Sequence, residues 1–179
     1  FPVQEQVLSG EDGLVVRLVE YHTAVSHAPF AMQPAQESLS VCFAEQLCLK
    51  GLTLSGGKRF DEGEVLPIAT EWYALEELET DYVIALFLAD ANNQVVAQAQ
   101  DSQPVAGFYP TSQWQPFAPV WDHRAIRFPN ALPAGEYHLL VAVYHFDSSG
   151  QLIRLPVDAA SSLESGTIAS LPINILVEK

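Results

Sequence analysis

The stretch of residues 136–146 constrains the fold more than any other part of the chain, because it is apolar on both sides. Successive side chains of an extended strand point to opposite faces. One face would carry Tyr137, Leu139, Val141 and Val143, and the other Leu140, Ala142 and Tyr144. Pro133 and Gly135 mark a turn just before this run. Such a strand must be covered on both faces, so it predicts a central position in the molecule.

Short runs of apolar residues recur along the chain, separated by turn residues. No segment longer than about ten residues carries the 3.6-residue period of a helix. Residues 171–177 alternate strictly with a period of two. The expected strands lie at residues 41–43, 47–54, 64–73, 81–90, 94–100, 120–128, 136–146, 151–155 and 171–177. This spacing favours an all-β fold, a sandwich of two antiparallel sheets with immunoglobulin-like or jelly-roll topology.

The first 40 residues differ from the rest of the chain. A short apolar run at residues 14–19 predicts one extra strand, and residues 27–36 read as an irregular connector. We therefore expect residues 1–40 to form an N-terminal arm with at most that strand, and residues 41–179 to form the β-sandwich domain. The predicted core includes Leu66, Ile68, Trp72, Ile84, Leu86, Tyr137, Leu139, Val141, Val143, Ile173 and Ile175.

Charge excludes one class of partner. The chain has 8 Lys and Arg against 22 Asp and Glu, a formal net charge of -14. Such a chain repels phosphate backbones, so we expect no nucleic-acid partner. No apolar run approaches the roughly 18 residues of a membrane span, so we expect no direct membrane insertion by this segment. The start at Phe1, without Met, is typical of a mature form or of a piece of a larger protein.

The two cysteines, Cys42 and Cys48, are separated by six positions. On one straight strand their Cα atoms would lie about 20 Å apart, far beyond the roughly 7 Å limit for a disulfide. A disulfide would require the chain to reverse at residues 44–46. We expect instead two small apolar side chains on one strand face.

Several short motifs resemble a known family. They are Phe43-Ala44-Glu45-Gln46-Leu47 with Gly51, Trp72-Tyr73-Ala74-Leu75 with Asp81-Tyr82, Asp101-Ser102-Gln103-Pro104 with Gly107-Phe108-Tyr109-Pro110-Thr111-Ser112-Gln113-Trp114, and Leu132-Pro133-Ala134-Gly135-Glu136-Tyr137. Together they resemble the extracytoplasmic C-terminal β-sandwich domain of bacterial multi-spanning membrane proteins related to protein mannosyltransferases. The resemblance covers roughly residues 41–179, and its most specific element is Tyr-Pro-Thr-Ser-x-Trp.

The resemblance implies an accessory domain in the cell envelope, tethered through a glycosyltransferase-like parent protein. Two turns depart from the family pattern, which usually has Pro-Gly-Glu there. This chain has Asp61-Glu62-Gly63-Glu64 in one place and Pro116-Phe117-Ala118 in the other. Both departures fall in turns, so they do not change the expected fold. They mean that the turns at the rim of this domain differ from those of the family.

Catalytic motifs are weak in this sequence. It contains no His-Glu-x-x-His and no Gly-x-Ser-x-Gly. His138 and His145 fall on opposite sides of one strand, so they cannot share a metal without a bulge. Asp122 and Arg124 share one side of another strand. We expect no enzyme activity from this domain and no cofactor.

Two acidic turns contain the carboxylates that would suit a hard cation. Asp61, Glu62 and Glu64 are weak Ca²⁺ candidates, but the turn lacks an EF-hand pattern. The second turn carries Glu76, Glu77, Glu79 and Asp81. We expect both turns to be solvated and no metal site to form.

A proline-rich loop holds the strongest candidates for contact with a ligand or partner. They are Phe108, Tyr109, Trp114, Phe117 and Trp121, interleaved with prolines that stiffen the loop. Rigid exposed aromatic rings stack well on sugars or on protein surfaces. Trp114 is the predicted dominant contact. The alternative is that Trp114 and Tyr109 fold inward and plug one end of the sandwich.

The sequence therefore predicts a non-catalytic accessory or binding domain on the outer side of the membrane, part of a larger glycosyltransferase-like protein. Its partner would be a glycan, a protein or the membrane part of the parent chain. A free-standing carbohydrate-binding module is the first alternative, and a hydrolase is the second.

Overall fold

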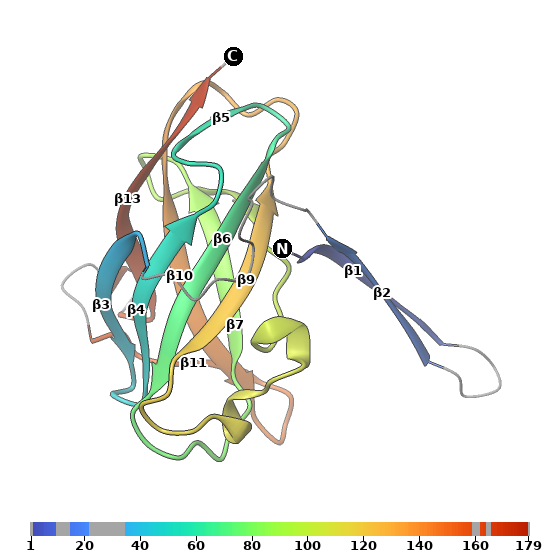
Figure 1. Ribbon diagram of the computed structural model, residues 1–179, viewed down its shortest axis with the longest axis vertical. Helices are drawn as coiled ribbons and strands as arrows, with labels where there is room; N and C mark the ends of the chain where they lie inside the picture. Colours follow the sequence, from blue (N-terminus) through green and yellow to red (C-terminus); the bar gives the residue numbers. More distant parts are fainter. Residues whose placement is uncertain (1, 10–14, 22–34, 159–161, 164–165, 179) are drawn as a thin grey trace.

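The computed structural model describes residues 2–9, 15–21, 35–158, 162–163 and 166–178 of the 179-residue chain. These residues fold almost entirely as β-strands (Figure 1). The strands are β1 (Pro2–Ser9), β2 (Val15–Tyr21), β3 (Glu37–Phe43), β4 (Leu47–Leu54), β5 (Arg59–Asp61), β6 (Val65–Ala74), β7 (Val83–Ala89), β8 (Val95–Gln98), β9 (Val120–Arg127), β10 (Gly135–Phe146), β11 (Leu152–Arg154), β12 (Ser162–Leu163) and β13 (Ile168–Glu178). Two short 3-10 turns, η1 (Val105–Gly107) and η2 (Thr111–Gln113), interrupt the loop before β9.

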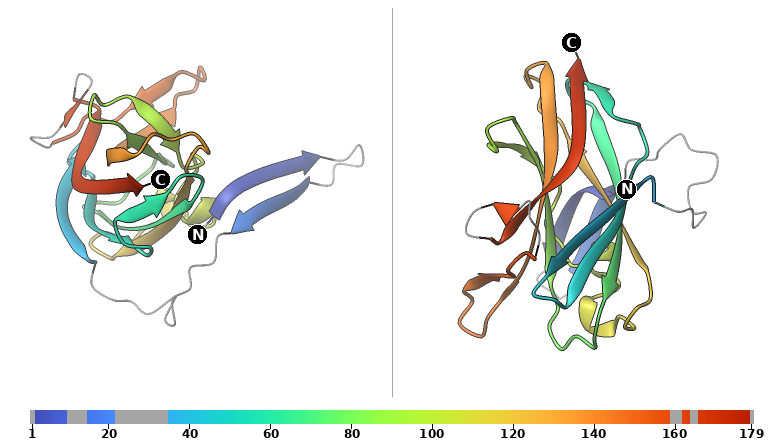
Figure 2. Two further views of the ribbon diagram at one scale, coloured as in Figure 1. Left: turned by 90° about the horizontal axis from the view of Figure 1, so that it is seen from above. Right: turned by 90° about the vertical axis from the view of Figure 1, so that its left-hand side faces the viewer.

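Two sheets pack face to face as a β-sandwich, which confirms the predicted fold class (Figure 2). One sheet has the order β3-β4-β6-β9. The other has the order β12-β13-β10-β7-β8, with β11 paired to β10 and β5 paired to β13. Among the described strands the pairings are antiparallel, except that β5 runs parallel to β13.

The space between the sheets is filled by a continuous hydrophobic core. All eleven residues predicted for the core are buried there. The central strand β10 is covered on both faces, as its sequence predicts. Its second face packs Leu140, Ala142 and Tyr144 into a smaller cluster with Ala85 and Ala89 of β7. Burial on both faces explains why this strand lacks a polar side over most of its length.

Tyr137 fixes the start of β10. Its hydroxyl donates a hydrogen bond of 2.7 Å to the carbonyl of Pro133, four residues upstream. This arrangement is the tyrosine corner found in many sandwich domains. Burial raises the pKa of Tyr137, and the charge of Asp90 raises it further. The Leu-Pro-x-Gly-x-Tyr motif thus has a local structural role.

Arg124 ties the two sheets together. Arg124 and Asp122, both on β9, are buried and form an ion pair of 2.7 Å between Nε and Oδ2. The guanidinium also donates to the carbonyl oxygens of Ile84, Gln100 and Ser102, at 2.8, 3.0 and 2.9 Å. These carbonyls belong to β7 and to the segment that follows β8. Arg124 therefore satisfies backbone acceptors where the edge of one sheet meets the other.

Cys42 and Cys48 form a disulfide, which corrects our expectation of two free thiols. The chain reverses after Phe43, with Ala44 and Glu45 at φ of 49° and 55°. The N–H of Gln46 donates to the carbonyl of Phe43 at 3.0 Å and closes the turn. β3 and β4 then pair with Cys42 opposite Cys48, at a Cα–Cα distance of 4.1 Å. Two non-glycine residues in the left-handed region produce a tight reversal that residue type did not indicate.

The N-terminal residues form a hairpin of two strands, where we expected at most one. β1 and β2 pair in a separate two-stranded sheet that projects from the sandwich near β9 (Figures 1 and 2). The extra strand predicted at residues 14–19 corresponds to β2. Most of the predicted connector, residues 27–34, lies outside the described residues. The sandwich itself begins at β3, a few residues before the predicted boundary at residue 41.

Candidate contact site at one end of the sandwich

The aromatic loop runs from residue 99 to residue 119 and returns the chain to β9 (Figure 1). Its first half is fixed by a buried carboxylate. The backbone N–H of Val105 donates to Oδ1 of Asp122 at 2.8 Å, while the other oxygen of Asp122 holds Arg124. Val105 and Ala106 adopt φ of 54° and 53°, a region that L-residues rarely occupy. The Asp122 contact holds the loop in this unfavourable conformation.

Thr111 anchors the second half of the loop. Its side chain is fully buried and its hydroxyl accepts the N–H of Tyr82 at 2.9 Å. The same hydroxyl donates to the carbonyl of Thr80 at 2.7 Å. Next to it, the N–H of Ser112 donates to Oδ1 of Asp81 at 3.1 Å. These bonds attach η2 to residues 75–82, the connector between β6 and β7.

Trp114 lies inside the sandwich and is only 4% exposed. Its indole N–H donates to the carbonyl of Tyr109 at 3.0 Å, and the two rings lie 6.3 Å apart. Tyr109 is half-buried and packs against the core. This burial corrects the expectation that Trp114 is held out toward a partner. Trp114 and Tyr109 close the end of the core, as the alternative interpretation predicts.

Phe108 and Phe117 point outward from the same loop, at 70% and 69% exposure. Phe117 has a φ of 62°, and its N–H donates to the carbonyl of Ala74 at 2.8 Å. Phe108 follows η1, and Trp121 lies half-buried on β9 opposite Glu71. The five predicted contact residues therefore divide into an inward pair, two outward rings and a half-buried tryptophan. They do not form one surface centred on Trp114.

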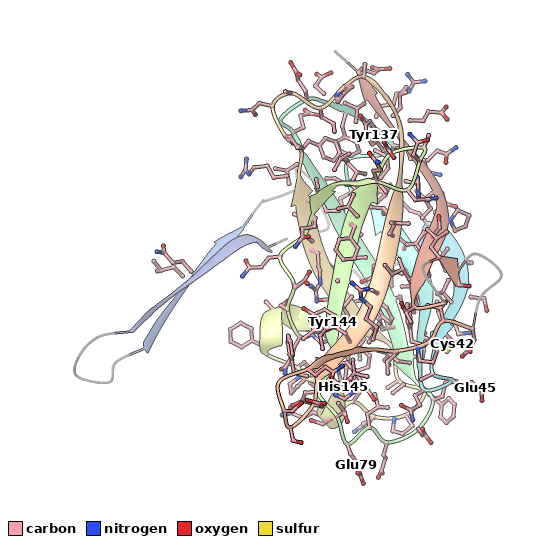
Figure 3. The ribbon with its side chains drawn as sticks, turned by 180° about the vertical axis from the view of Figure 1, so that it is seen from behind. Cys42, Glu45, Glu79, Tyr137, Tyr144 and His145 are labelled. Carbon is pink, nitrogen blue, oxygen red and sulfur yellow. A yellow bond between two sulfur atoms is a disulfide. The ribbon has the colours of Figure 1, made fainter. Side chains whose placement is uncertain are left out.

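Phe117 lies at the end of the sandwich where several turns meet. The tip of the β3–β4 hairpin joins the 75–82 connector through a 2.8 Å bond from the Leu75 N–H to the Gln46 carbonyl. His145, near the end of β10, packs edge-on against Tyr82, with ring centroids 5.6 Å apart. Glu45, Glu79 and His145 lie at this end, far from Tyr137 (Figure 3). We call this region the acidic end; it comprises residues 44–46, 75–82 and 111–119.

Carboxylates dominate the acidic end. Leu78 is buried and fixes the connector to the core, so its neighbours face solvent. The exposed acidic residues are Glu45, Glu76, Glu77, Glu79 and Asp81. No Lys or Arg occurs between Arg59 and Arg124 in the sequence. The sequence predicts a solvated turn at residues 76–81. It does not show that this turn lies at the same end of the sandwich as Phe117, because the hydrogen bonds from Thr111 to Thr80 and from Phe117 to Ala74 join residues far apart in the chain.

The predicted calcium candidates do not converge. Asp61, Glu62 and Glu64 are exposed at the turn after β5, and Oε2 of Glu64 accepts the N–H of Asp61 at 2.8 Å. That bond serves the turn itself. Among the described residues, no group of three or more His, Cys, Asp or Glu side chains is placed to hold a metal ion.

The described histidines on β9 and β10 occupy separate places. Nε2 of His138 lies 2.9 Å from Oδ1 of Asn93, in the turn between β7 and β8. His145 lies beside the acidic end, where its ring packs against Tyr82. The pKa of His123 on β9 is lowered by its burial, which disfavours the charged ring.

Asp147 has a lowered pKa because it accepts hydrogen bonds from the side chain of Ser149 and the backbone of Gln151. Asp147 therefore organises its own turn.

No family model and no curated protein sequence matches this chain. Within the described part of the chain, the helical segments are single 3-10 turns, and none is long or apolar enough to cross a membrane.

Proposed function

We propose that this chain is a non-catalytic binding or accessory domain. The observation that carries the proposal is the construction of the aromatic loop. Buried Asp122, Thr111 and Trp114 fix it from inside, while Phe108 and Phe117 face solvent. An anchored loop loses little conformational entropy on binding, and an exposed ring gains free energy when a partner buries it.

We further propose that the domain faces the outside of the cell, as an accessory part of a larger glycosyltransferase-like membrane protein. The disulfide between Cys42 and Cys48 supports this location, because such bonds persist mainly in oxidising compartments. The family resemblance of residues 41–179 supports the connection to a glycosyltransferase. The partner is then a protein surface, in the parent chain or in a neighbour.

A carbohydrate-binding module is the second candidate. The exposed ring of Phe108 favours it, since an accessible aromatic face can stack on a sugar. Against it, the loop turns Trp114 and Tyr109 toward the core, so two of the five predicted stacking rings close the sandwich instead of facing a sugar.

Site-specific photo-crosslinking tests the proposal. A benzoylphenylalanine replaces Phe108 or Phe117 in the parent protein, expressed in its own cell envelope. Exposed Val95 on β8 provides the control position. We expect protein adducts from the loop positions and few from position 95.

A glycan array with the isolated chain separates the two candidates. The accessory role predicts no glycan binding, whereas a carbohydrate-binding module predicts binding at micromolar to millimolar affinity that Phe108→Ala abolishes.

In the crosslinking experiment, equal adduct formation from position 95 and from the loop positions would show that the loop is not a contact site.

A further inference from the structure

The sheet that contains β7 and β10 is apolar on its outer side as well as on its core side. In antiparallel sheets one face is commonly solvated and polar. The outward positions of residues 83–89 on β7 and 140–146 on β10 instead hold Val83, Ala85, Phe87, Ala89, Leu140, Ala142, Tyr144 and Phe146. The outer side of the other sheet carries polar residues such as Glu71, Tyr73, His123 and Arg127. We call the first surface the outward apolar face.

This face is buried in its middle and exposed where the β10–β11 hairpin begins. Ala85 and Ala142 are almost fully buried. Phe146 and its cross-strand partner Leu152 are 58% and 41% exposed. The ring of Phe146 packs edge-on against Tyr144, with centroids 5.7 Å apart. Exposed apolar side chains that adjoin a larger apolar surface are typical of a contact with another molecule.

Two opposite charges flank this exposed end. Tyr144, labelled in Figure 3, donates a hydrogen bond of 2.9 Å from its hydroxyl to Oδ2 of Asp101. Asp101 lies next to Ser102, which pairs with β7. Arg154 lies opposite Tyr144 on β11, on the other side of β10, so its side chain shares the outward apolar face. The face therefore has a carboxylate on one side of Tyr144 and a guanidinium on the other.

The carboxylate of Asp101 lacks one hydrogen bond. Its Oδ1 is buried and has no hydrogen-bond partner among the described residues. A buried acceptor without a donor costs free energy. A guanidinium has five N–H donors, more than one partner can use. A guanidinium brought by a second molecule could therefore supply the missing donor.

We propose that two copies of this chain associate through the exposed end of the outward apolar face, about a two-fold axis. Burial of Phe146 and Leu152 drives the association. Arg154 of each copy pairs with Asp101 of the other. A two-fold interface needs a self-complementary surface, and one acid and one base on opposite sides of an apolar centre provide it. This interface does not use the exposed rings of the aromatic loop, so it is separate from the contact role proposed above.

Sedimentation equilibrium of the whole chain tests the proposal. The formal net charge of -14 opposes self-association at long range. The measurement is therefore made at physiological salt, where the screening length is about 8 Å. We expect the average mass to rise with concentration toward that of a dimer. Phe146→Ser should raise the dissociation constant of the dimer about tenfold or more.

Val95→Ser provides the matched control, because Val95 is an exposed apolar residue on β8 of the same sheet. It should change the dissociation constant less than about twofold. Leu18→Ser tests association through the N-terminal hairpin, where Leu18 is exposed. It too should leave the dimer unchanged.

A charge exchange tests the pairing of the two copies. Arg154→Glu alone places two acids together at each contact, and Asp101→Arg alone places two bases together, so each variant should be monomeric. An equal mixture of the two should form a heterodimer, because both contacts then join opposite charges. Circular dichroism checks that each variant is folded. Should Asp101→Arg not fold, Asp101→Asn keeps an acceptor for Tyr144 and should raise the dissociation constant about threefold.

The mass of a single chain at every concentration would overturn the proposal. So would an equal loss of association in Phe146→Ser and Val95→Ser, or a loss in Leu18→Ser with none in Phe146→Ser. Two folded charge variants that remain monomeric when mixed would show that Arg154 and Asp101 do not meet across the interface.

Discussion

At the scale of single residues, Arg124 is the clearest case of a side chain whose removal should be costly. It neutralises the fully buried Asp122 and satisfies three backbone carbonyls. Arg124→Met leaves a buried carboxylate without its counter-ion. We expect it to lower the free energy of unfolding by about 3 to 5 kcal/mol in urea denaturation.

A double-mutant cycle provides the control. Asp122→Asn removes the charge but keeps an oxygen that can accept the Val105 N–H. The double variant should therefore lose less stability than the sum of the two single variants. Additive losses would mean that Arg124 acts mainly through the carbonyls of β7 and the segment after β8.

Tyr144 should make the stability of the fold depend on pH in the alkaline range. Its burial, followed by its hydrogen bond to Asp101 and the charge of that carboxylate, raises its pKa from 10.0 to about 12. At a pH between these two pKa values, the hydroxyl of Tyr144 is deprotonated in the unfolded chain and protonated in the native chain. Native protein then binds more protons, so stability falls as pH rises through this window and is unaffected below it.

Urea denaturation at about pH 9 and about pH 11 checks this expectation. The wild-type chain should lose more stability over that interval than Tyr144→Phe, which cannot titrate there. The comparison removes the contributions of the other tyrosines. Equal losses in both proteins would place the pKa of Tyr144 at its ordinary value.

At the scale of elements, the disulfide closes the β3–β4 hairpin around its tip. A bridge stabilises mainly by restricting the unfolded chain, and a loop of about seven residues gives about 2 kcal/mol. We expect Cys42→Ala/Cys48→Ala to lose about that amount in urea denaturation. The fold should survive, since Ala44 also bonds to the Pro156 carbonyl and Glu45 to Asp158. An unchanged midpoint would show that the bridge does not stabilise the native fold.

The aromatic loop predicts opposite effects for two of its residues. Trp114→Ala empties a large buried site and should cost about 3 to 5 kcal/mol. Phe117→Gly removes an exposed ring and a left-handed phenylalanine, so stability should be unchanged or raised by up to about 1 kcal/mol. Thermal or urea unfolding of the two variants measures the contrast. A large loss from Phe117→Gly would show that its ring supports the fold.

The sequence predicted the elements best where a strand is buried on one or both faces. β4, β9 and β10 were expected within a residue of their observed bounds, because alternating burial leaves a strong period of two. β5 and β12 were missed; they are too short to show a period. The hairpin tip was missed for another reason, since neither Ala44 nor Glu45 signals a left-handed turn.

At the scale of the whole molecule, the sandwich class followed from short strands and turns, whereas the candidate site did not follow from the aromatic residues. An aromatic residue in a proline-rich loop can face inward or outward, and the choice depends on partners far away in sequence. Trp114 lies inside the sandwich, three residues after Thr111, whose hydroxyl bonds to the Thr80 carbonyl and attaches this part of the loop to the core. Phe117 was turned outward by its bond to Ala74. Such contacts become visible only when the chain is folded.

The N-terminal hairpin and the sandwich should separate as folding units. β1 and β2 pair with each other in their own sheet, and β1 lies near β9 without joining its sheet. Gln36, in contrast, belongs to the sandwich: its N–H donates to Oγ1 of Thr53 and its side chain accepts the Leu54 N–H. Removal of residues 1–34 should therefore leave the sandwich folded, with its free energy of unfolding lowered by less than about 1 kcal/mol.

Urea denaturation of the shortened chain measures this, and a second truncation that also removes residues 35 and 36 serves as the control. The longer deletion should cost about 1 to 2 kcal/mol more, because Thr53 and Leu54 lose their partners. Unfolding of the sandwich after the shorter deletion would contradict the separation. It would mean that β1 completes the edge of the sheet at β9 and that the hairpin belongs to the domain.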